Sequence, residues 1–314
     1  MGSSALFADR RAVAALATLC CVLWGSAVPA VKVGYELFAI AATDLGSLLL
    51  FAGVRFSLAG LMLLVFAIAS RRPIGLGARG FAQVALLGLV QTAIQYWLFY
   101  VGVANTTAVN VAITTSTSSF FGVLLAHFLY ADDKLTWRRT LGCAAGFLGV
   151  IAVNLSAGGL ALEFSILGEG AIMLAAFIIS GATIYGKRLS RGMDATVMTG
   201  WQLLIGGLLL AGAGLIGGGR LAGAGFGAGE IALVAYLAAL SAVAFSVWSV
   251  LFKYNPVSAV APYQFLIPVF GVLLAGLILG ENIFAWKNLA ALLLVSLGIW
   301  LVTTRGRPPV VTPA

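Results

Sequence analysis

The chain has 314 residues, of which 61% are hydrophobic and only 9% are charged. A soluble domain carries roughly 25% charged residues, so this composition excludes a water-soluble protein and indicates a lipid bilayer as the solvent. The net charge of +8 would suit a nucleic-acid-binding protein if the chain were soluble, but in a membrane protein it reports orientation instead.

Ten apolar stretches predict transmembrane helices, each of which needs about 20 residues to cross a bilayer. In chain order they cover residues 12–32, 45–69, 81–102, 106–130, 138–156, 168–187, 195–216, 229–252, 256–279 and 286–303. The connections between them are too short to hold a soluble domain. We therefore predict an all-α membrane protein of ten transmembrane helices.

The distribution of charge predicts how these helices are oriented. With a cytoplasmic N-terminus, 14 of the 18 lysines and arginines fall in cytoplasmic segments, as the positive-inside rule requires. The outer loops then hold Arg220 and Lys287 together with six acidic residues: Glu36, Asp44, Glu163, Glu169, Glu230 and Glu281. We predict that both termini are cytoplasmic.

The two halves of the chain resemble each other. "FFGVLLAHFLYADDKLTWRRTLGCAAGFLGVIAV" (120–153) aligns without a gap with "VFGVLLAGLILGENIFAWKNLAALLLVSLGIWLV" (269–302), with ten of 34 positions identical. Because each half holds five helices, the second must enter the membrane upside down, which is the inverted repeat of many secondary transporters. The predicted units are a first repeat (1–156), a second, inverted repeat (157–304) and a cytoplasmic tail (305–314).

These features resemble a known family. The two aligned blocks, "LWGSAVPAVK" in the first helix and "VRFSLAGLM" in the second are similar to the drug/metabolite transporter superfamily in its EamA-type branch, and within it to bacterial aromatic amino acid exporters. The resemblance implies a multi-pass protein of the bacterial inner membrane with a central cavity lined by both halves. The chain departs from the family pattern where the first half has "ADD" in place of the "GEN" of the second.

Aromatic and polar side chains on the predicted helices indicate a substrate-binding cavity, because rings stack on flat solutes while amides and hydroxyls bind amino and carboxyl groups. An interfacial aromatic belt or helix packing is the competing interpretation for the aromatic residues. The predicted substrate-binding residues are Trp24, Gln91, Gln95, Tyr96, Trp97, Asn110, Thr114, Ser118, Ser241, Phe245, Trp248, Tyr263 and Gln264.

The run of six hydroxyl residues from Thr114 to Ser119 lies inside the fourth predicted helix. On one continuous helix, Asn110, Thr114 and Ser118 form a stripe at i, i+4 and i+8, and we predict that this stripe faces the cavity. The single histidine, His127, lies beyond it and is predicted to be a packed or interfacial residue.

Arg55 is the basic residue that lies deepest in a predicted span. It either pairs with a substrate carboxylate or with polar groups of the cavity, or it snorkels to the outer surface or binds backbone carbonyl groups. Lys32 and Lys187 end their spans, and we interpret them as snorkelling residues. Pro29, Pro262 and Pro268 lie inside predicted helices, where they form either gate hinges or static kinks.

All ten acidic residues fall in predicted loops or at helix ends, so no carboxylate is expected at mid-membrane. This disfavours a cationic drug as substrate and a simple proton relay, and it predicts a facilitator or exchanger. The chain has one histidine and no HExxH or GxSxG motif, so we predict neither an enzyme nor a cofactor or metal site.

Together these features predict an inner-membrane transporter that exports aromatic or other neutral amino acids by alternating access. The alternative is an exporter of an unrelated metabolite or an amphipathic drug. The predicted partners are a small-molecule substrate and the lipid bilayer, with no nucleic acid. The sequence leaves the oligomeric state open, a monomer included.

Overall fold

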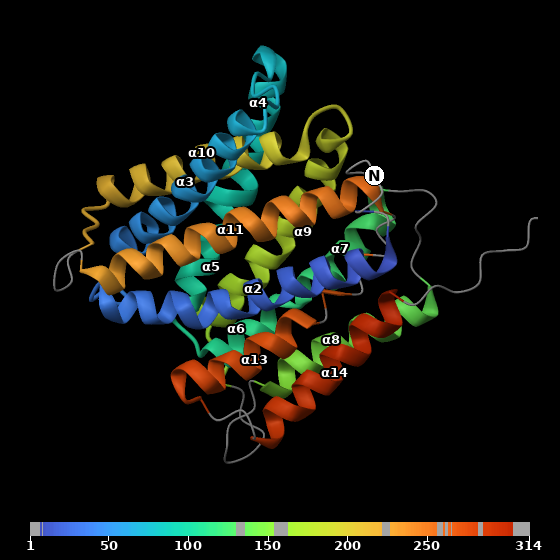
Figure 1. Ribbon diagram of the computed structural model, residues 1–314. Coiled ribbons are helices and arrows are strands. Elements are labelled where there is room, and N and C mark those ends of the chain that lie inside the picture. The colour runs from blue at the N-terminus through green and yellow to red at the C-terminus, as the bar shows by residue number, and fades with distance from the viewer. Residues whose placement is uncertain are drawn as a thin grey trace, which may run out of the picture.

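The computed structural model describes residues 7, 9–129, 136–153, 163–221, 227–255, 260, 263–264, 266–281 and 285–303. Within these ranges the regular structure is helical and contains no strand. Figure 1 shows long helices packed side by side. The predicted tail (305–314) and the "ADD" segment lie outside the described residues.

Helices occupy the described part of every predicted segment. The helices are α2 (Arg10–Leu37), α3 (Leu45–Ala69), α4 (Gly77–Leu87), the π-helix η1 (Gly88–Ile94), α5 (Gln95–Ala104), α6 (Ala108–Thr115), α7 (Thr117–Leu129), α8 (Trp137–Val153), the π-helix η2 (Ile166–Gly170), α9 (Ala171–Ser190), α10 (Ala195–Ile216), α11 (Ala228–Tyr254), α13 (Leu266–Leu279) and α14 (Trp286–Thr303). Among the described residues, six continuous helices are long and apolar enough to cross a bilayer: α2, α3, α4–η1–α5, η2–α9, α10 and α11. Membrane crossing by the four other segments and the cytoplasmic position of both termini stay predictions.

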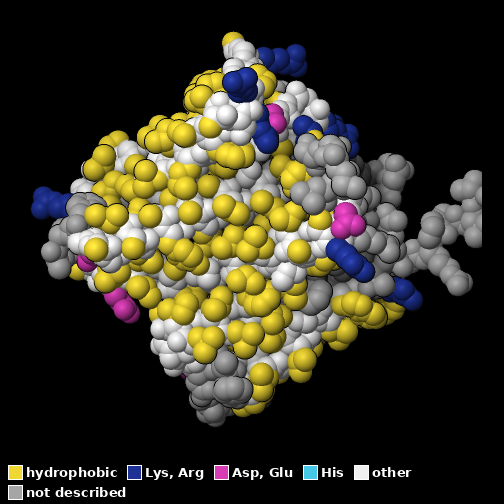
Figure 2. Space-filling view, in the orientation of Figure 1, with side chains coloured by type: hydrophobic (Ala, Val, Ile, Leu, Met, Phe, Trp, Pro, Cys, Tyr) yellow, Lys and Arg dark blue, Asp and Glu magenta, His cyan; other side chains and the backbone are white. Residues whose placement is uncertain are grey.

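The surface of the bundle suits lipid. Side chains such as Ile216, Leu277 and Val65 are 91%, 80% and 57% exposed. Figure 2 shows hydrophobic side chains across the middle of one face, with charged side chains toward its edges. Water would penalise this arrangement, whereas a bilayer stabilises it.

Carboxylate caps fix the start of three helices. Asp9, Asp44 and Asp194 precede α2, α3 and α10, and each accepts backbone N–H groups of the first turn. The bond from the Ser47 N–H holds the pKa of the Asp44 carboxyl below its ordinary value. A lowered pKa means that this cap contributes stability at neutral pH and is lost only as the pH falls through the folded-state pKa.

Helices α3 and α10 pack closely through glycines. Each helix carries them at seven-residue spacing: Gly46, Gly53 and Gly60 on α3, and Gly200, Gly207 and Gly214 on α10. A Cβ on Gly60 would lie 2.7 Å from the carbonyl oxygen of Gly200, and one on Gly214 would lie 2.7 Å from that of Gly46. The two backbones therefore touch, as in small-residue packing of membrane helices, and we call this contact the glycine seam.

The packing partners correspond between the two halves. Helix α2 packs on α11 and α13, while α9, which occupies the matching place in the second half, packs on α5 and on α6 and α7. Helix α3 packs on α10, and α8 packs on α14, as Figure 1 also shows. Each of these contacts made by a helix of the first half therefore has an equivalent contact made by a helix of the second half. Inversion of the second half across the membrane stays a prediction.

The fourth predicted segment differs from the single helix expected there. It is two helices, α6 and α7, which meet at Ser116. Hydroxyl groups cause the break by bonding to the chain's own carbonyl oxygens: Thr115 donates to Val111 and Thr117 to Thr114, both at 2.7 Å. Such bonds compete with helical hydrogen bonding and bend helices.

The three predicted hinge prolines have different settings. Pro29 lies inside α2, which continues through it from Arg10 to Leu37. Pro268 was predicted to lie in a helix interior, but it falls in the first turn of α13, which begins at Leu266. Proline is tolerated there because the first-turn N–H groups have no partner within the helix, so the predicted interior position of Pro268 is wrong, while its role as a hinge stays a prediction. Pro262 lies outside the described residues.

Candidate functional site

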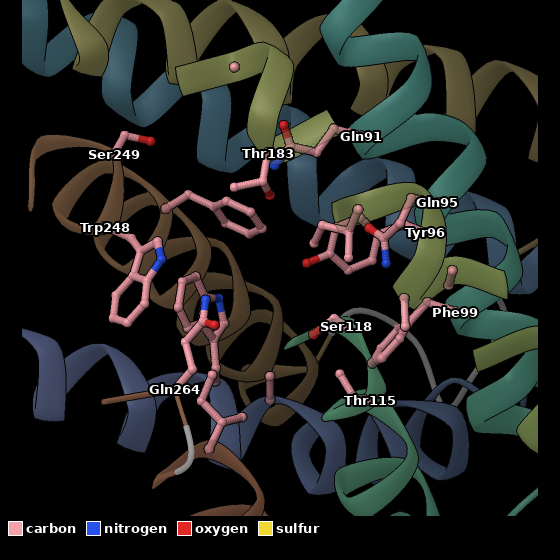
Figure 3. Close-up of a pocket in the computed structure, with 18 of the residues that line it drawn as sticks. Gln91, Gln95, Tyr96, Phe99, Thr115, Ser118, Thr183, Trp248, Ser249 and Gln264 are labelled. Atoms are coloured by element: carbon pink, nitrogen blue, oxygen red, sulfur yellow. The ribbon is translucent and has the colours of Figure 1, made fainter. Parts of the chain in front are cut away.

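A cavity of about 210 Å³ lies between the two halves. Its walls come from α2, Arg55 of α3, η1 and α5, the α6–α7 junction, α9, α10 and α11, together with Gln264 and the first turns of α13. Figure 3 shows Gln91, Gln95, Tyr96 and Phe99 on one side, with Trp248 and Ser249 on the other. The volume suits a small solute.

The cavity is not centred in the bundle. Its lining includes Ser190, the last residue of α9, and Phe252, near the end of α11. Toward the opposite end the lining stops at Phe99 and Ile172. The cavity therefore extends to the end that the charge pattern predicts to be cytoplasmic and stops short of the other.

Aromatic rings form one wall of this cavity. Trp24 makes edge contacts with Trp248 and Phe245, with ring centroids 5.1 and 5.6 Å apart. The Tyr96 ring lies 6.3 Å from Phe245 and 4.2 Å from Phe56. Trp24 of α2 and Phe245 and Trp248 of α11 build this wall, so both halves contribute to it, and it can stack against a flat solute. Tyr96 of α5 lines the facing side, while Phe56 of α3 contacts Tyr96 from outside the lining.

Amide and hydroxyl groups complete the lining. Gln91 belongs to η1 and Gln95 begins α5. Gln95 is 4% exposed, and its Oε1 has no hydrogen-bond partner among the described residues. A π-helix is rare and often marks a functional site. The unpartnered oxygen is an acceptor that a solute donor could satisfy.

Arg55 lies at the cavity wall and is only 2% exposed. Its Nε donates to Ser241 Oγ at 2.9 Å, and its Nη1 donates to the Tyr100 hydroxyl at 3.0 Å. Its guanidinium carbon lies 4.8 Å from the Phe56 ring centroid. The snorkelling alternative for Arg55 is therefore wrong. Tyr100 is fully buried rather than part of an interfacial belt.

The charge of the lining is positive. Arg55 and Lys187 both line the cavity, and no aspartate or glutamate does so among the described residues. Lys187 thus lies at the mouth of the cavity rather than serving only as a snorkelling residue. The lining favours neutral or anionic solutes over cations.

Beyond the cavity, Glu281 caps α6. Its Oε1 and Oε2 accept the backbone N–H groups of Ala108 and Val109, each at 2.9 Å. These N–H groups are in the first turn of α6, where the helix dipole also favours a negative charge. This carboxylate therefore joins the end of α13 to the start of α6, across the end where the cavity is absent.

Two more charged side chains, Glu169 and Lys32, bind residues near the start of α6. Glu169 accepts hydrogen bonds from Asn110 Nδ2 at 2.8 Å and from the Thr106 hydroxyl. Lys32 Nζ donates to the Thr106 carbonyl oxygen at 2.6 Å, so Lys32 binds protein rather than snorkelling. We call Lys32, Glu169 and Glu281 the end cluster. It ties α2, η2 and α13 to the α5–α6 link and to the first turn of α6.

Most of the predicted substrate-binding residues line this one cavity. These are Trp24, Gln91, Gln95, Tyr96, Ser118, Phe245, Trp248 and Gln264, together with the predicted cavity charge Arg55. Their role in binding stays a proposal. Ser241 is outside the lining but bonds to Arg55. His127 lies outside the lining as well.

Besides Ser241, four predicted residues are not brought into the lining. Trp97 is 44% exposed on the outside of α5, because it lies midway between Gln95 and Phe99, which face the cavity four residues apart. Tyr263 packs beside the aromatic group around Trp248 instead of reaching the cavity. The other two, Asn110 and Thr114, belong to the predicted hydroxyl stripe.

That stripe is wrong apart from Ser118, because the chain breaks at Ser116 and helical spacing does not continue across the break. Asn110 bonds to Glu169 in the end cluster, and Thr114 is fully buried with a hydroxyl that has no hydrogen-bond partner among the described residues. Thr115 and Ser116 line the cavity in their place, beside Ser118.

Sequence reasoning did not single out Glu169, Glu281 or Gln202. Gln202 lines the cavity and is 3% exposed, and its Nε2 donates to the Thr92 hydroxyl at 3.4 Å. An amide in an apolar helix was a usable signal for Gln202, as it was for Gln91 and Gln95. The two glutamates lie at predicted helix ends, where a charged residue is common and does not by itself indicate a structural contact.

The sequence profile described as "EamA-like transporter family" matches residues 11–155 and 166–304. The chain belongs to this family. The chain is 25% identical over 262 residues to "Uncharacterized transporter YvbV" of Bacillus subtilis, covering 82% of this chain and 83% of that one. It is 29% identical over 305 residues to "Uncharacterized inner membrane transporter YedA" of Escherichia coli K12, covering 93% and 92%.

One solved structure, described as "Crystal structure of protein", has the same fold. The TM-score is 0.65 at 16% sequence identity, with 93% of this chain and 96% of that chain covered. Membership in the EamA-like family makes this a multi-pass membrane transporter of a small-molecule substrate and agrees with the absence of enzymatic motifs. The prediction of the family is confirmed, and the aromatic amino acid specificity stays a proposal.

Proposed function

We propose that this EamA-like transporter exports aromatic or other neutral amino acids across a bacterial inner membrane by alternating access. One observation carries the proposal: the cavity combines the Trp24–Phe245–Trp248 ring wall with amides, hydroxyls and a cation, and has no acidic residue in its described lining. Rings stack on an aromatic side chain, while the polar groups bind the amino and carboxyl groups.

The two matches of one family profile, one in each half, support a duplication. The odd number of helices per half and the charge distribution are the basis for proposing an inverted repeat with both termini cytoplasmic. In that arrangement the cavity extends to the cytoplasmic end, where an exporter loads its substrate. No carboxylate is available in the described lining for a proton relay. We therefore propose a facilitator or exchanger.

Transport into proteoliposomes tests the function directly. Labelled tryptophan, phenylalanine and threonine are compared with a cationic dye, in vesicles with and without protein and with and without a pH gradient. We expect protein-dependent uptake of amino acids, strongest for the aromatic pair, without need of a gradient. Uptake of the dye alone would instead identify a drug exporter, and equal leakage for every solute would defeat the proposal.

The tryptophan wall predicts a specific variant effect. Replacing Trp248 with leucine removes a ring of the cavity wall that would stack on the solute, so tryptophan uptake should fall by about two- to tenfold, since an aromatic pair contributes roughly 0.5–1.5 kcal/mol. Trp97→Leu is the matched control because Trp97 lies outside the cavity lining. Uptake is normalised to folded protein measured by gel filtration, and an equal fall in both variants would remove the wall from the site.

A further inference from the structure

Arg55 is a buried cation whose described hydrogen-bond partners are both neutral. Nε is bound to Ser241 Oγ and Nη1 to the Tyr100 hydroxyl. A guanidinium has five N–H donors, and these two bonds leave others free for a further acceptor. The Phe56 ring beside it adds a favourable contact but no negative charge.

No carboxylate within the described chain pairs with this cation. The one ion pair recorded there joins Arg72 to Asp194, near the start of α10. A charge held in a membrane interior is costly unless it is paired, and such residues commonly mark solute pathways. An anion entering the cavity would offset the cost of burying Arg55.

The partners of Arg55 are themselves held in place. The Ser241 hydroxyl donates to the Leu237 carbonyl oxygen at 2.8 Å, so its oxygen accepts the Arg55 Nε–H. Tyr100 is fully buried, and its carbonyl oxygen accepts the Tyr35 hydroxyl at 3.2 Å. A guanidinium held on two sides loses little entropy when a ligand binds, and its planar fork matches a carboxylate.

We propose that Arg55 binds the carboxylate of the transported solute, with Ser241 and Tyr100 as positioning residues. The substrate class is therefore a solute with a carboxylate and a flat apolar body, and a solute that lacks the carboxylate is rejected. The inference rests on the proposed function in taking this cavity as the transport pathway, but it does not require the solute to be an amino acid.

Four compounds test the carboxylate and the amine of the solute separately. Tryptophan carries both groups, tryptophanamide and tryptamine lack the carboxylate, and indole-3-propionate lacks the amine. Each competes with labelled tryptophan for uptake by the wild-type protein in proteoliposomes. We expect tryptophan and indole-3-propionate to compete, and the amide and the amine to need at least about tenfold higher concentration, the size of one charge-assisted hydrogen bond. Equal competition by tryptophanamide would overturn the carboxylate site and leave the amino acid proposal standing.

Variants test the assignment to Arg55. Arg55→Gln should remove the preference for tryptophan over tryptophanamide, and Arg55→Lys should restore part of it by returning the charge without the fork. Arg220→Gln is the matched control, since Arg220 is exposed and outside the cavity lining. A retained preference in Arg55→Gln would overturn the proposal.

Binding measured without transport separates the two proposals. Thermal stability of the detergent-purified protein is recorded with the same four ligands, because a ligand that binds the folded state raises the melting temperature. Stabilisation by indole-3-propionate without any amino acid uptake would defeat the proposed function while supporting the carboxylate site. If neither carboxylate stabilises more than the amide or amine does, the carboxylate site is overturned.

Discussion

Replacing Gly60 with leucine is expected to prevent accumulation of correctly folded protein. A Cβ at this position would lie 2.7 Å from the carbonyl oxygen of Gly200, and the atom that would have to move belongs to backbone rather than to a flexible side chain. Overpacking costs about 1–3 kcal/mol even where side chains can shift. Here the seam itself must open, against a total stability of about 5–15 kcal/mol.

The matched control is a glycine of α10, the helix that packs against α3. Gly212 is in α10, and a Cβ there would meet nothing within 4 Å. Gly212→Leu should therefore leave the yield and melting temperature close to wild type. Both are measured by gel filtration and thermal scans in detergent. A normal yield for Gly60→Leu would show that α3 and α10 are not in backbone contact.

Replacing Glu281 with glutamine is expected to open the end of the bundle opposite the cavity mouth. The carboxylate accepts two N–H groups of α6, whereas a glutamine keeps one acceptor oxygen and turns its NH₂ toward a donor. Losing a hydrogen bond to a charged group costs about 1.5–3 kcal/mol, which shifts the ratio of closed to open forms by roughly 10- to 100-fold.

A cysteine introduced at Ser118, in the cavity lining, reports this opening. Glu281→Gln should raise its rate of modification by a membrane-impermeant thiol reagent applied to the predicted outer side. Glu163→Gln provides the control, because Glu163 is an exposed carboxylate for which no bond is recorded. Equal rates in both variants would mean that the end cluster does not hold the cavity shut.

The sequence was a reliable guide where the membrane constrains the choice. Long apolar segments have to be helices in lipid, and the described helices begin close to the predicted positions except α13, which begins at Leu266 rather than at 256. Gln91 and Gln95 are costly to expose to hydrocarbon, so their polarity indicated inward side chains, and both line one cavity. Arg55 lines the same cavity, but the sequence alone left the snorkelling alternative open.

Local chemistry and long-range contacts were harder to predict. Ser116 ends α6 through hydroxyl bonds whose strength relative to the helix cannot be judged from spacing. Glu281 contacts residues 173 and 172 positions away, and nothing near it in the sequence indicates those partners. Trp97 is different: its two-residue spacing from Gln95 places the two side chains on opposite sides of a helix.

The glycine seam also constrains how the two halves move. Because backbone meets backbone along α3 and α10, the two helices have no layer of flexible side chains between them to accommodate sliding. The α3–α10 pair should therefore stay fixed and act as the rotation axis about which the cavity helices α2, α5, α9 and α11 tilt. Alternate exposure of the cavity would then come from rotation about that axis. The hydrogen bonds of the end cluster would break when the cavity opens to the predicted outer side and form again when it opens to the predicted cytoplasmic side.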